Sequence, residues 1–191
     1  MAKGSEWERE CSKILSLWAT EGARDDVIWR TSGSGSRWTT RRKRGSDTYN
    51  QAGDLCATDP CAQFLFDFLL VECKRGYAKG KPSESINVLY WLDRPSNTKP
   101  PLLAQWWEKA DEERLRAGRS RAVLLFRRTG KRACIVLERD LMGDLEDYIG
   151  QYKHHVIALY MAEGPTLLIC DLERWLEWCQ PEAIKRMQET Y

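Results

Sequence analysis

The sequence predicts an α/β protein in which a mixed central sheet is flanked by helices. An apolar run at residues 64–71 is typical of a buried strand. Two further strands, at 122–127 and 133–138, are joined by a turn at Thr129-Gly130. Helical patterns precede and separate these strands, so the expected chain order is α-β-β-β-α-β-β. The 191 residues suffice for one domain with a sizeable core.

The first expected element is an amphipathic helix over about residues 5–21. Ser5-x-x-Glu8 has the form of a capping box, and Gly22 is a natural stop. A short strand follows at 27–30. Residues 31–52 then form a long, polar, basic loop that we expect to be mobile and functional, because structureless loops of this length are uncommon inside compact domains.

The apolar run continues to Glu72-Cys73-Lys74, the single Asp/Glu-x-Lys triplet of the chain. Alternation along a strand places Glu72 and Lys74 on one face and Cys73 on the other. A short strand at 54–58 is expected to form a hairpin with this strand, which would bring Asp54 beside Glu72. Carboxylate oxygens next to an ammonium predict a site for a hard divalent cation. The structural alternative is a turn acid after Gly53 and a salt bridge at the strand end.

The second half of the chain begins with a Gly/Lys/Pro/Ser segment at 76–85 and a helix at about 101–117. Beyond the strand pair, the sequence predicts a helix, strands at 156–161 and 166–170, and a terminal helix pair. We therefore expect a core at 1–147 and a C-terminal α/β extension at 148–191 that packs on it.

Charge is distributed unevenly although the net charge is only +2. Residues 1–137 carry 25 Lys and Arg against 17 Asp and Glu, whereas residues 138–191 carry 5 against 11. Three clusters of Lys and Arg contain no acidic residue, and two of them flank the acidic site in sequence. Such clusters favour a surface that binds phosphate backbones. The alternative for any one cluster is ordinary solvated surface. The clusters are Arg37, Arg41, Arg42, Lys43 and Arg44; Lys74, Arg75, Lys79 and Lys81; and Arg127, Arg128, Lys131 and Arg132.

The seven cysteines are irregularly spaced. Cys56 and Cys61 form a C-x4-C pair, but no second pair completes a zinc site, so we expect free thiols in a reducing cytosol. No apolar run approaches the roughly 18 residues of a membrane span, and the N-terminus has no apolar signal region. A cytoplasmic protein without membrane contact is the expectation.

Four pieces occur in an order that resembles the archaeal-type Holliday-junction resolvases, a branch of the PD-(D/E)xK or restriction-endonuclease-like nucleases. They are Lys3-Gly4-Ser5-Glu6-Trp7-Glu8-Arg9-Glu10, then Trp29-Arg30-Thr31-Ser32-Gly33-Ser34, then Gly53-Asp54, then Val71-Glu72-Cys73-Lys74. The resemblance covers roughly residues 3–75, and the remaining elements fit the fold to about 147. The loop before Asp54 is longer than the family's, and residues 148–191 have no counterpart in the minimal fold.

The resemblance implies a restriction-endonuclease-like core and a homodimeric, Mg²⁺-dependent DNA endonuclease that resolves branched, four-way junctions by paired cuts, with Mn²⁺ as a substitute ion. The implied catalytic residues are Glu8, Asp54, Glu72 and Lys74; the implied metal ligands are Asp54, Glu72, the Cys73 backbone carbonyl and Glu8. Expected DNA contacts are Arg9, Arg30, Ser34 (with Ser36 as the alternative loop serine), Arg37, Trp38, Arg41, Arg42, Lys43, Arg44, Arg75, Lys79 and Lys81. Surplus aromatic surface for a dimer is expected from Trp91, Trp106, Trp107, Trp175 and Trp178.

Two other functions stay open from the sequence. One is a restriction- or repair-like nuclease that cuts duplex or flap DNA with the same chemistry. The other is a DNA-binding protein in which this fold has lost activity. The acids and lysine of the site argue against the second, because an inactive protein has no need to keep a costly acid cluster.

Overall fold

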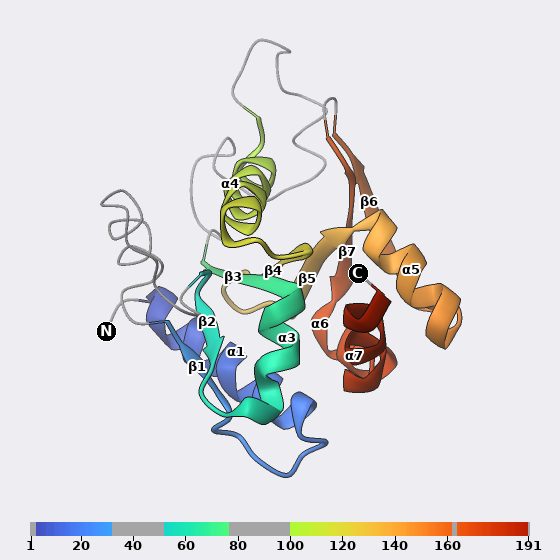
Figure 1. Cartoon of the computed structure of the whole chain (residues 1–191). Coiled ribbons are helices and arrows are strands. Elements are labelled where there is room, and N and C mark those ends of the chain that lie inside the picture. Colours follow the sequence, from blue (N-terminus) through green and yellow to red (C-terminus); the bar gives the residue numbers. More distant parts are fainter. Residues whose placement is uncertain (1–2, 32–51, 77–99, 162–163, 191) are drawn as a thin grey trace.

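The computed structural model describes residues 3–31, 52–76, 100–161 and 164–190. A five-stranded mixed sheet in the order β3-β4-β5-β7-β6 forms the centre of this part (Figure 1). Strands β3 and β4 are parallel, and the other neighbouring pairs are antiparallel. The predicted class, a mixed sheet flanked by helices as in restriction-endonuclease-like folds, is confirmed. The strands are β3 (Leu69–Arg75), β4 (Arg121–Arg127), β5 (Ala133–Glu138), β6 (Val156–Tyr160) and β7 (Thr166–Asp171).

Helices cover both faces of this sheet (Figure 1). On one face α4 (Leu102–Ala117) packs on β3 and β4 and buries Leu103, Trp106 and Trp107. The other face carries α1 (Lys3–Ala19), α5 (Arg139–Ile149) and α6 (Leu172–Trp178), while α7 (Pro181–Thr190) packs on α3 and α5. Two apolar cores result, one on each side of the sheet.

The first half of the apolar run is a helix, so the predicted strand at 64–74 is wrong for its N-terminal part. Asp59 caps a 3₁₀ turn at Pro60–Ala62 (η1), and α3 (Gln63–Phe68) follows it directly. Gln63 donates to Asp67 across one helical turn at 2.7 Å on the exposed side. Periodicity does not separate a short buried helix from a buried strand in such a run, and here the capped turn favours the helix.

The expected hairpin between 54–58 and the next strand is also absent from the described residues. Strand β2 (Leu55–Ala57) pairs antiparallel with β1 (Ile28–Arg30), and this small sheet lies beside α1. The chain then crosses through η1 and α3 before it enters β3. Asp54 nevertheless reaches β3, since its backbone amide donates to the Val71 carbonyl at 3.0 Å.

The C-terminal segment contributes to the sheet itself. Strand β7 lies between β5 and β6, so the acidic last third of the chain supplies a central strand. Strand β6 lies at the edge of the sheet opposite to β3 and exposes Val156, Ile157 and Tyr160. No helix in the described ranges is long and apolar enough to cross a membrane.

Of the five tryptophans expected to supply surplus aromatic surface, the four that the structure describes are buried or half-buried, which corrects that expectation. Trp106, Trp107 and Trp175 are all buried, and the half-buried Trp178 donates its indole N–H to the Gly150 carbonyl at 3.0 Å. Trp7 donates its indole N–H to the Leu125 carbonyl of β4. Trp91 lies outside the described residues. Two separate cores absorb more aromatic volume than the single small core on which the expectation was based.

Candidate active site

The N-terminal helix brings Glu8 to the site. Helix α1 begins at Lys3, so Ser5 lies within it rather than at its cap. The Glu8 side chain instead accepts a hydrogen bond from Arg30 Nε at 2.5 Å, and Glu8 is only 9% exposed. Glu8 therefore does not act as the carboxylate of a capping box. It forms an ion pair with Arg30 that joins α1 to the end of β1.

The Gly53-Asp54 turn is held by hydrogen bonds on every side. Thr31 donates its hydroxyl to the Gly53 carbonyl at 2.7 Å and its amide to the Asp54 carbonyl at 3.0 Å. The Asp54 carboxylate, on a residue that is 7% exposed, accepts from the Cys73 amide at 2.8 Å. This fixed carboxylate therefore lies against the outer edge of β3.

Strand β3 supplies the remaining groups. Glu72 and Lys74 form an ion pair on the face that carries α4, and Cys73 points into the core beneath α1. In a strand, the N–H and C=O of one residue point to the same side. The Cys73 amide faces Asp54, so the Cys73 carbonyl also points out from this edge of the sheet. A carbonyl that ligates a metal beside Asp54, as predicted, has to point in this direction.

Burial and mutual repulsion perturb the acids. Burial and the nearby Glu72 carboxylate raise the pKa of Asp54 from 3.8 to about 7, against the opposing effects of the Cys73 hydrogen bond and Lys74. Burial alone would lower the pKa of Lys74, but Glu72 and Asp54 raise it above its ordinary value. Lys74 is consequently an ammonium group at neutral pH, paired with the carboxylates.

The donor set fits a hard divalent cation. Asp54, Glu72 and the Cys73 carbonyl offer only oxygen, and the excess negative charge that raises the Asp54 pKa is what a cation would neutralise. Within the described ranges no group of three or more His, Cys, Asp or Glu side chains is gathered tightly enough to hold a metal by side chains alone. Among the described residues, a metal site here would therefore be built from two carboxylates and a backbone oxygen. Cys56 and Cys61 are free thiols.

One further acid lies at this site, Glu113 of α4, and it was not predicted from the sequence. Its Oε1 accepts a hydrogen bond from the Gly53 amide at 2.9 Å. Burial raises the pKa of Glu113, and Glu72 raises it further, against the Gly53 hydrogen bond and Lys74. The sequence does contain a pattern that indicates Glu113. It follows Ala110 by three residues and so continues the buried stripe of α4, where a carboxylate needs a partner.

The predicted DNA contacts are only partly within the described residues. Arg75 pairs with Glu6 of α1 at 2.9 Å, Arg30 pairs with Glu8, and Arg9 is half-buried on α1. The other predicted contacts lie outside the described residues: Ser34, Ser36, Arg37, Trp38, Arg41, Arg42, Lys43, Arg44, Lys79 and Lys81.

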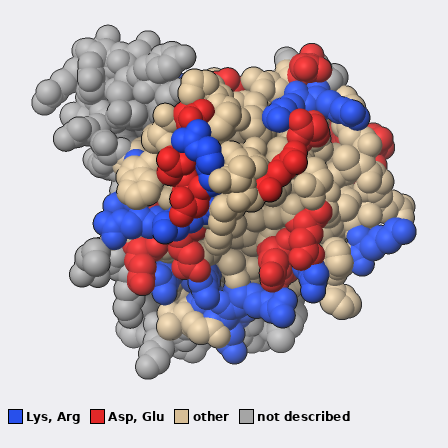
Figure 2. All heavy atoms as spheres, turned by 90° about the horizontal axis from the view of Figure 1, so that it is seen from below, with Lys and Arg blue, Asp and Glu red and all other residues tan. Residues whose placement is uncertain are grey.

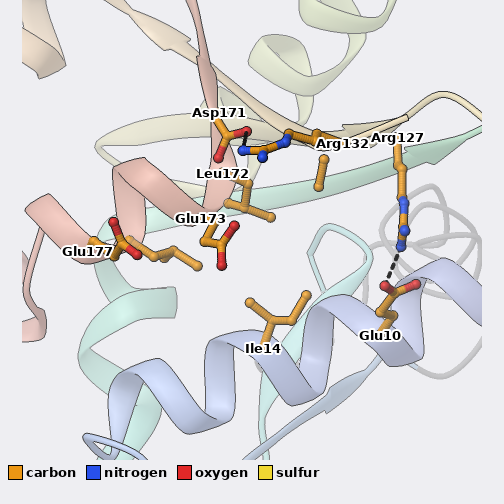
Figure 3. Close-up of a pocket in the computed structure, with 10 residues that line it drawn as sticks. Glu10, Ile14, Arg127, Arg132, Asp171, Leu172, Glu173 and Glu177 are labelled. Atoms are coloured by element: carbon orange, nitrogen blue, oxygen red, sulfur yellow. Dashed lines mark hydrogen bonds and ion pairs between the residues drawn. The ribbon is translucent and has the colours of Figure 1, made fainter. Parts of the chain in front are cut away.

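A surface cavity in the described part of the chain lies away from Asp54, Glu72 and Lys74. It has a volume of about 540 Å³ and lies between α1, the β4–β5 turn and α6 (Figure 3). Its charged lining includes Glu10, Asp171, Glu173 and Glu177, and Glu10 and Asp171 pair with Arg127 and Arg132. Figure 2 shows acidic and basic side chains intermixed on the face of the molecule seen from below, and such a face is a poor surface for a polyanion.

A mixed sheet with Glu72-Cys73-Lys74 on an edge strand and a buried aspartate beside it defines a nuclease of the PD-(D/E)xK class. The family described as "Phage putative PDDEXK endonuclease" matches residues 1–186, and the chain belongs to this family. The match is to this endonuclease family rather than to the archaeal-type resolvase branch. No curated protein and no solved structure matches the chain.

The raised pKa of Asp54 predicts that the metal-free protein loses stability as the pH rises. Between 3.8 and about 7 the folded state binds a proton that the unfolded state has released. Folding is therefore favoured below this window and loses roughly 4 kcal/mol across it. In chelator, we expect a melting temperature roughly 5–10 °C higher near pH 5 than near pH 8, since part of this window lies below pH 5. Calorimetry across this range measures it.

Asp54→Asn should remove most of this dependence and raise the melting temperature near pH 8. Burial also raises the pKa values of Glu113 and Glu138, so these two residues should leave a smaller loss of stability with rising pH in the variant. Asp147→Asn, an exposed substitution on α5, is the matched control and should follow the wild type. Equal pH dependence in Asp54→Asn and wild type would contradict the prediction.

Proposed function

We propose that this endonuclease hydrolyses DNA phosphodiesters at the site formed by Asp54, Glu72 and Lys74, with four-way junctions as its preferred substrate. The observation that carries the proposal is the buried Asp54 carboxylate, which accepts from the Cys73 amide at 2.8 Å at the edge of β3 where Glu72 and Lys74 form their ion pair. An acid buried beside another acid is expensive unless a cation or a proton compensates it. This cost favours a working site over a chance salt bridge.

Asp54, Glu72 and the Cys73 carbonyl are the proposed ligands of Mg²⁺, which Mn²⁺ would replace, and Glu8 would lie among these ligands or directly behind them. The ion would lower the pKa of a bound water and neutralise charge on the scissile phosphate. Lys74 would orient the attacking water and stabilise the charge that develops on the phosphoryl oxygens. Its raised pKa makes it a poor general base.

Arg30 is proposed to contact a phosphate next to the scissile one. Its Nε is held by Glu8 at 2.5 Å, which fixes the plane of the guanidinium. A fixed, planar donor of this kind suits phosphate recognition. Arg9 on α1 and Arg75 at the end of β3 are further candidates.

The preference for branched DNA rests on the resemblance of the N-terminal motifs to the junction resolvases. Two symmetric cuts need two sites, so we propose a homodimer with two-fold symmetry. The outer edge of β6 suits pairing with the β6 strand of a second copy. Antiparallel pairing centred on Ala158 would place Val156 opposite Tyr160 and Ile157 opposite Leu159, and β6 carries no charged side chain that would oppose this pairing. A second candidate function is cleavage of duplex or flap DNA, which is favoured by a family description that specifies an endonuclease and no junction.

The deciding experiment is cleavage of matched four-way junction, flap and linear duplex substrates in Mg²⁺, Mn²⁺ and chelator. Paired, symmetric cuts in the junction at a rate at least about tenfold above the duplex support the proposal. Equal cutting of all three substrates would establish the generic endonuclease instead. Sedimentation at micromolar concentration tests the dimer in the same samples.

The basic loop is proposed to bind phosphates without reading sequence. Replacement of Arg37, Arg41, Arg42, Lys43 and Arg44 by alanine should weaken binding to all DNA forms alike. Each lost phosphate contact reduces the slope of log affinity against log salt by about 0.9. Fluorescence anisotropy over a salt series measures both effects. Unchanged affinity at low salt would assign the loop another role.

A further inference from the structure

We propose that Glu113 is a positioning residue of the nuclease site, acting through the Gly53 amide to fix Asp54. This inference rests on the proposed function for its catalytic consequence. Its structural basis is the 2.9 Å hydrogen bond from the Gly53 amide to Glu113 Oε1, which joins two residues 60 positions apart.

The turn before Asp54 needs such an external partner. Gly53 has a φ of +75°, and a Cβ atom at this position would lie 2.7 Å from the Val71 carbonyl oxygen. Only glycine fits, and glycine is also the residue with the greatest backbone freedom. The conformation of the turn is therefore set by hydrogen bonds rather than by its own torsional preference.

Those hydrogen bonds come from separate elements. Thr31, just after β1, holds the Gly53 carbonyl, and Val71 of β3 accepts from the Asp54 amide. Glu113 holds the remaining polar group of the turn, the Gly53 N–H. Without Glu113 this N–H, on a buried residue, loses the acceptor that the structure gives it.

Helix α4 delivers this carboxylate from a rigid support. Leu103, Trp106, Trp107 and Ala110 anchor the helix in the core over β3 and β4. Glu72 and Lys74 point to the same face of the sheet, and Glu113 is close enough to both to interact electrostatically. Among the described residues, the Glu113 carboxylate bonds a backbone amide, which is the geometry of a support rather than of a ligand.

The charge of Glu113 and its hydrogen-bond acceptor can be separated by mutation. Glu113→Gln keeps an oxygen that accepts from Gly53 and removes the charge, whereas Glu113→Ala removes both. Glu112→Ala is the matched control, because Glu112 is an exposed neighbour on α4 that pairs with Arg116. The variants are compared by kcat and KM on the substrate that the wild type cuts best, and by the rise in melting temperature that Mg²⁺ produces.

Positioning predicts that Glu113→Ala lowers kcat by about 10- to 100-fold with KM changed less than about threefold. It also predicts a smaller Mg²⁺-induced rise in melting temperature, since Asp54 is less well placed to bind the ion. Glu113→Gln should recover both readouts to within about threefold of wild type. Glu112→Ala should behave as wild type in both.

Two results would overturn the inference: wild-type behaviour of Glu113→Ala, or equal losses in Glu113→Gln and Glu113→Ala, which would assign the effect to charge. The melting-temperature readout does not depend on cleavage. A wild-type protein that cuts none of the DNA substrates would defeat the proposed function, and the Mg²⁺-induced shift would still decide the role of Glu113.

Discussion

Asp54→Asn should reduce DNA cleavage by at least about 10³-fold while DNA binding is kept or strengthened. Asparagine has the same shape and still presents an oxygen to the Cys73 amide, which donates to Asp54 Oδ2 at 2.8 Å. The substitution removes the negative charge that Asp54 would share with Glu72 in holding a cation. It also removes repulsion between the site and the phosphate backbone, which is why binding should not weaken.

The measurement pairs single-turnover cleavage in Mg²⁺ with anisotropy binding in Ca²⁺ or chelator. Glu72→Gln should show the same pattern, although it also frees Lys74 from its ion pair. Asp147→Asn, exposed on α5, should cleave and bind as the wild type does. Full activity in both Asp54→Asn and Glu72→Gln would remove this cluster from the chemistry, whatever the fold.

Lys74→Met should have the second-largest effect, a loss of about 10²- to 10³-fold in cleavage rate. Methionine keeps the apolar stem of the side chain and removes the ammonium. The carboxylates of Asp54 and Glu72 remain, so the Mg²⁺-induced rise in melting temperature should be retained. Loss of rate without loss of metal binding would identify Lys74 as a group that acts on the water or the phosphoryl oxygens.

Raising the pH separates two roles for Lys74. If it were a general base, hydroxide would restore part of the rate of Lys74→Met at alkaline pH. Its pKa is raised above the ordinary lysine value by Glu72 and Asp54, in spite of burial. We therefore expect that, up to about pH 9, the cleavage rate of Lys74→Met rises with pH no more than the rate of the wild type does. Lys109→Met, an exposed substitution on α4, is the control; recovery specific to Lys74→Met would contradict the electrostatic role.

Local patterns in the sequence were enough to predict much of the fold. The β4–β5 hairpin follows from the two short apolar runs on either side of Thr129-Gly130, and α4 follows from its helical stripe. The alternation that places Glu72 and Lys74 on one face of β3 needs only the two-residue period of a strand. These features depend on neighbours within a few positions, and such neighbours are visible in a sequence.

Tertiary packing decided what the patterns left ambiguous. The run at 64–68 is helical because a capped turn precedes it and α7 lies against it. The tryptophans enter two cores because α4 covers the face of the sheet opposite to α1. Strand β7 lies between β5 and β6, an order that no local period specifies.

The chain by itself determined which groups could form the site: Asp54, Glu72 and Lys74, at spacings that suit a strand and a preceding turn. Only the folded structure decided how Asp54 reaches Glu72, since it arrives through the β1–β2 sheet and the α3 crossover rather than through a hairpin. The same is true of Glu113, 60 residues from the Gly53 amide that it binds. A carboxylate on the buried stripe of a helix needs a partner, but its identity depends on how α4 packs over β3, and that packing is set by contacts distant in sequence.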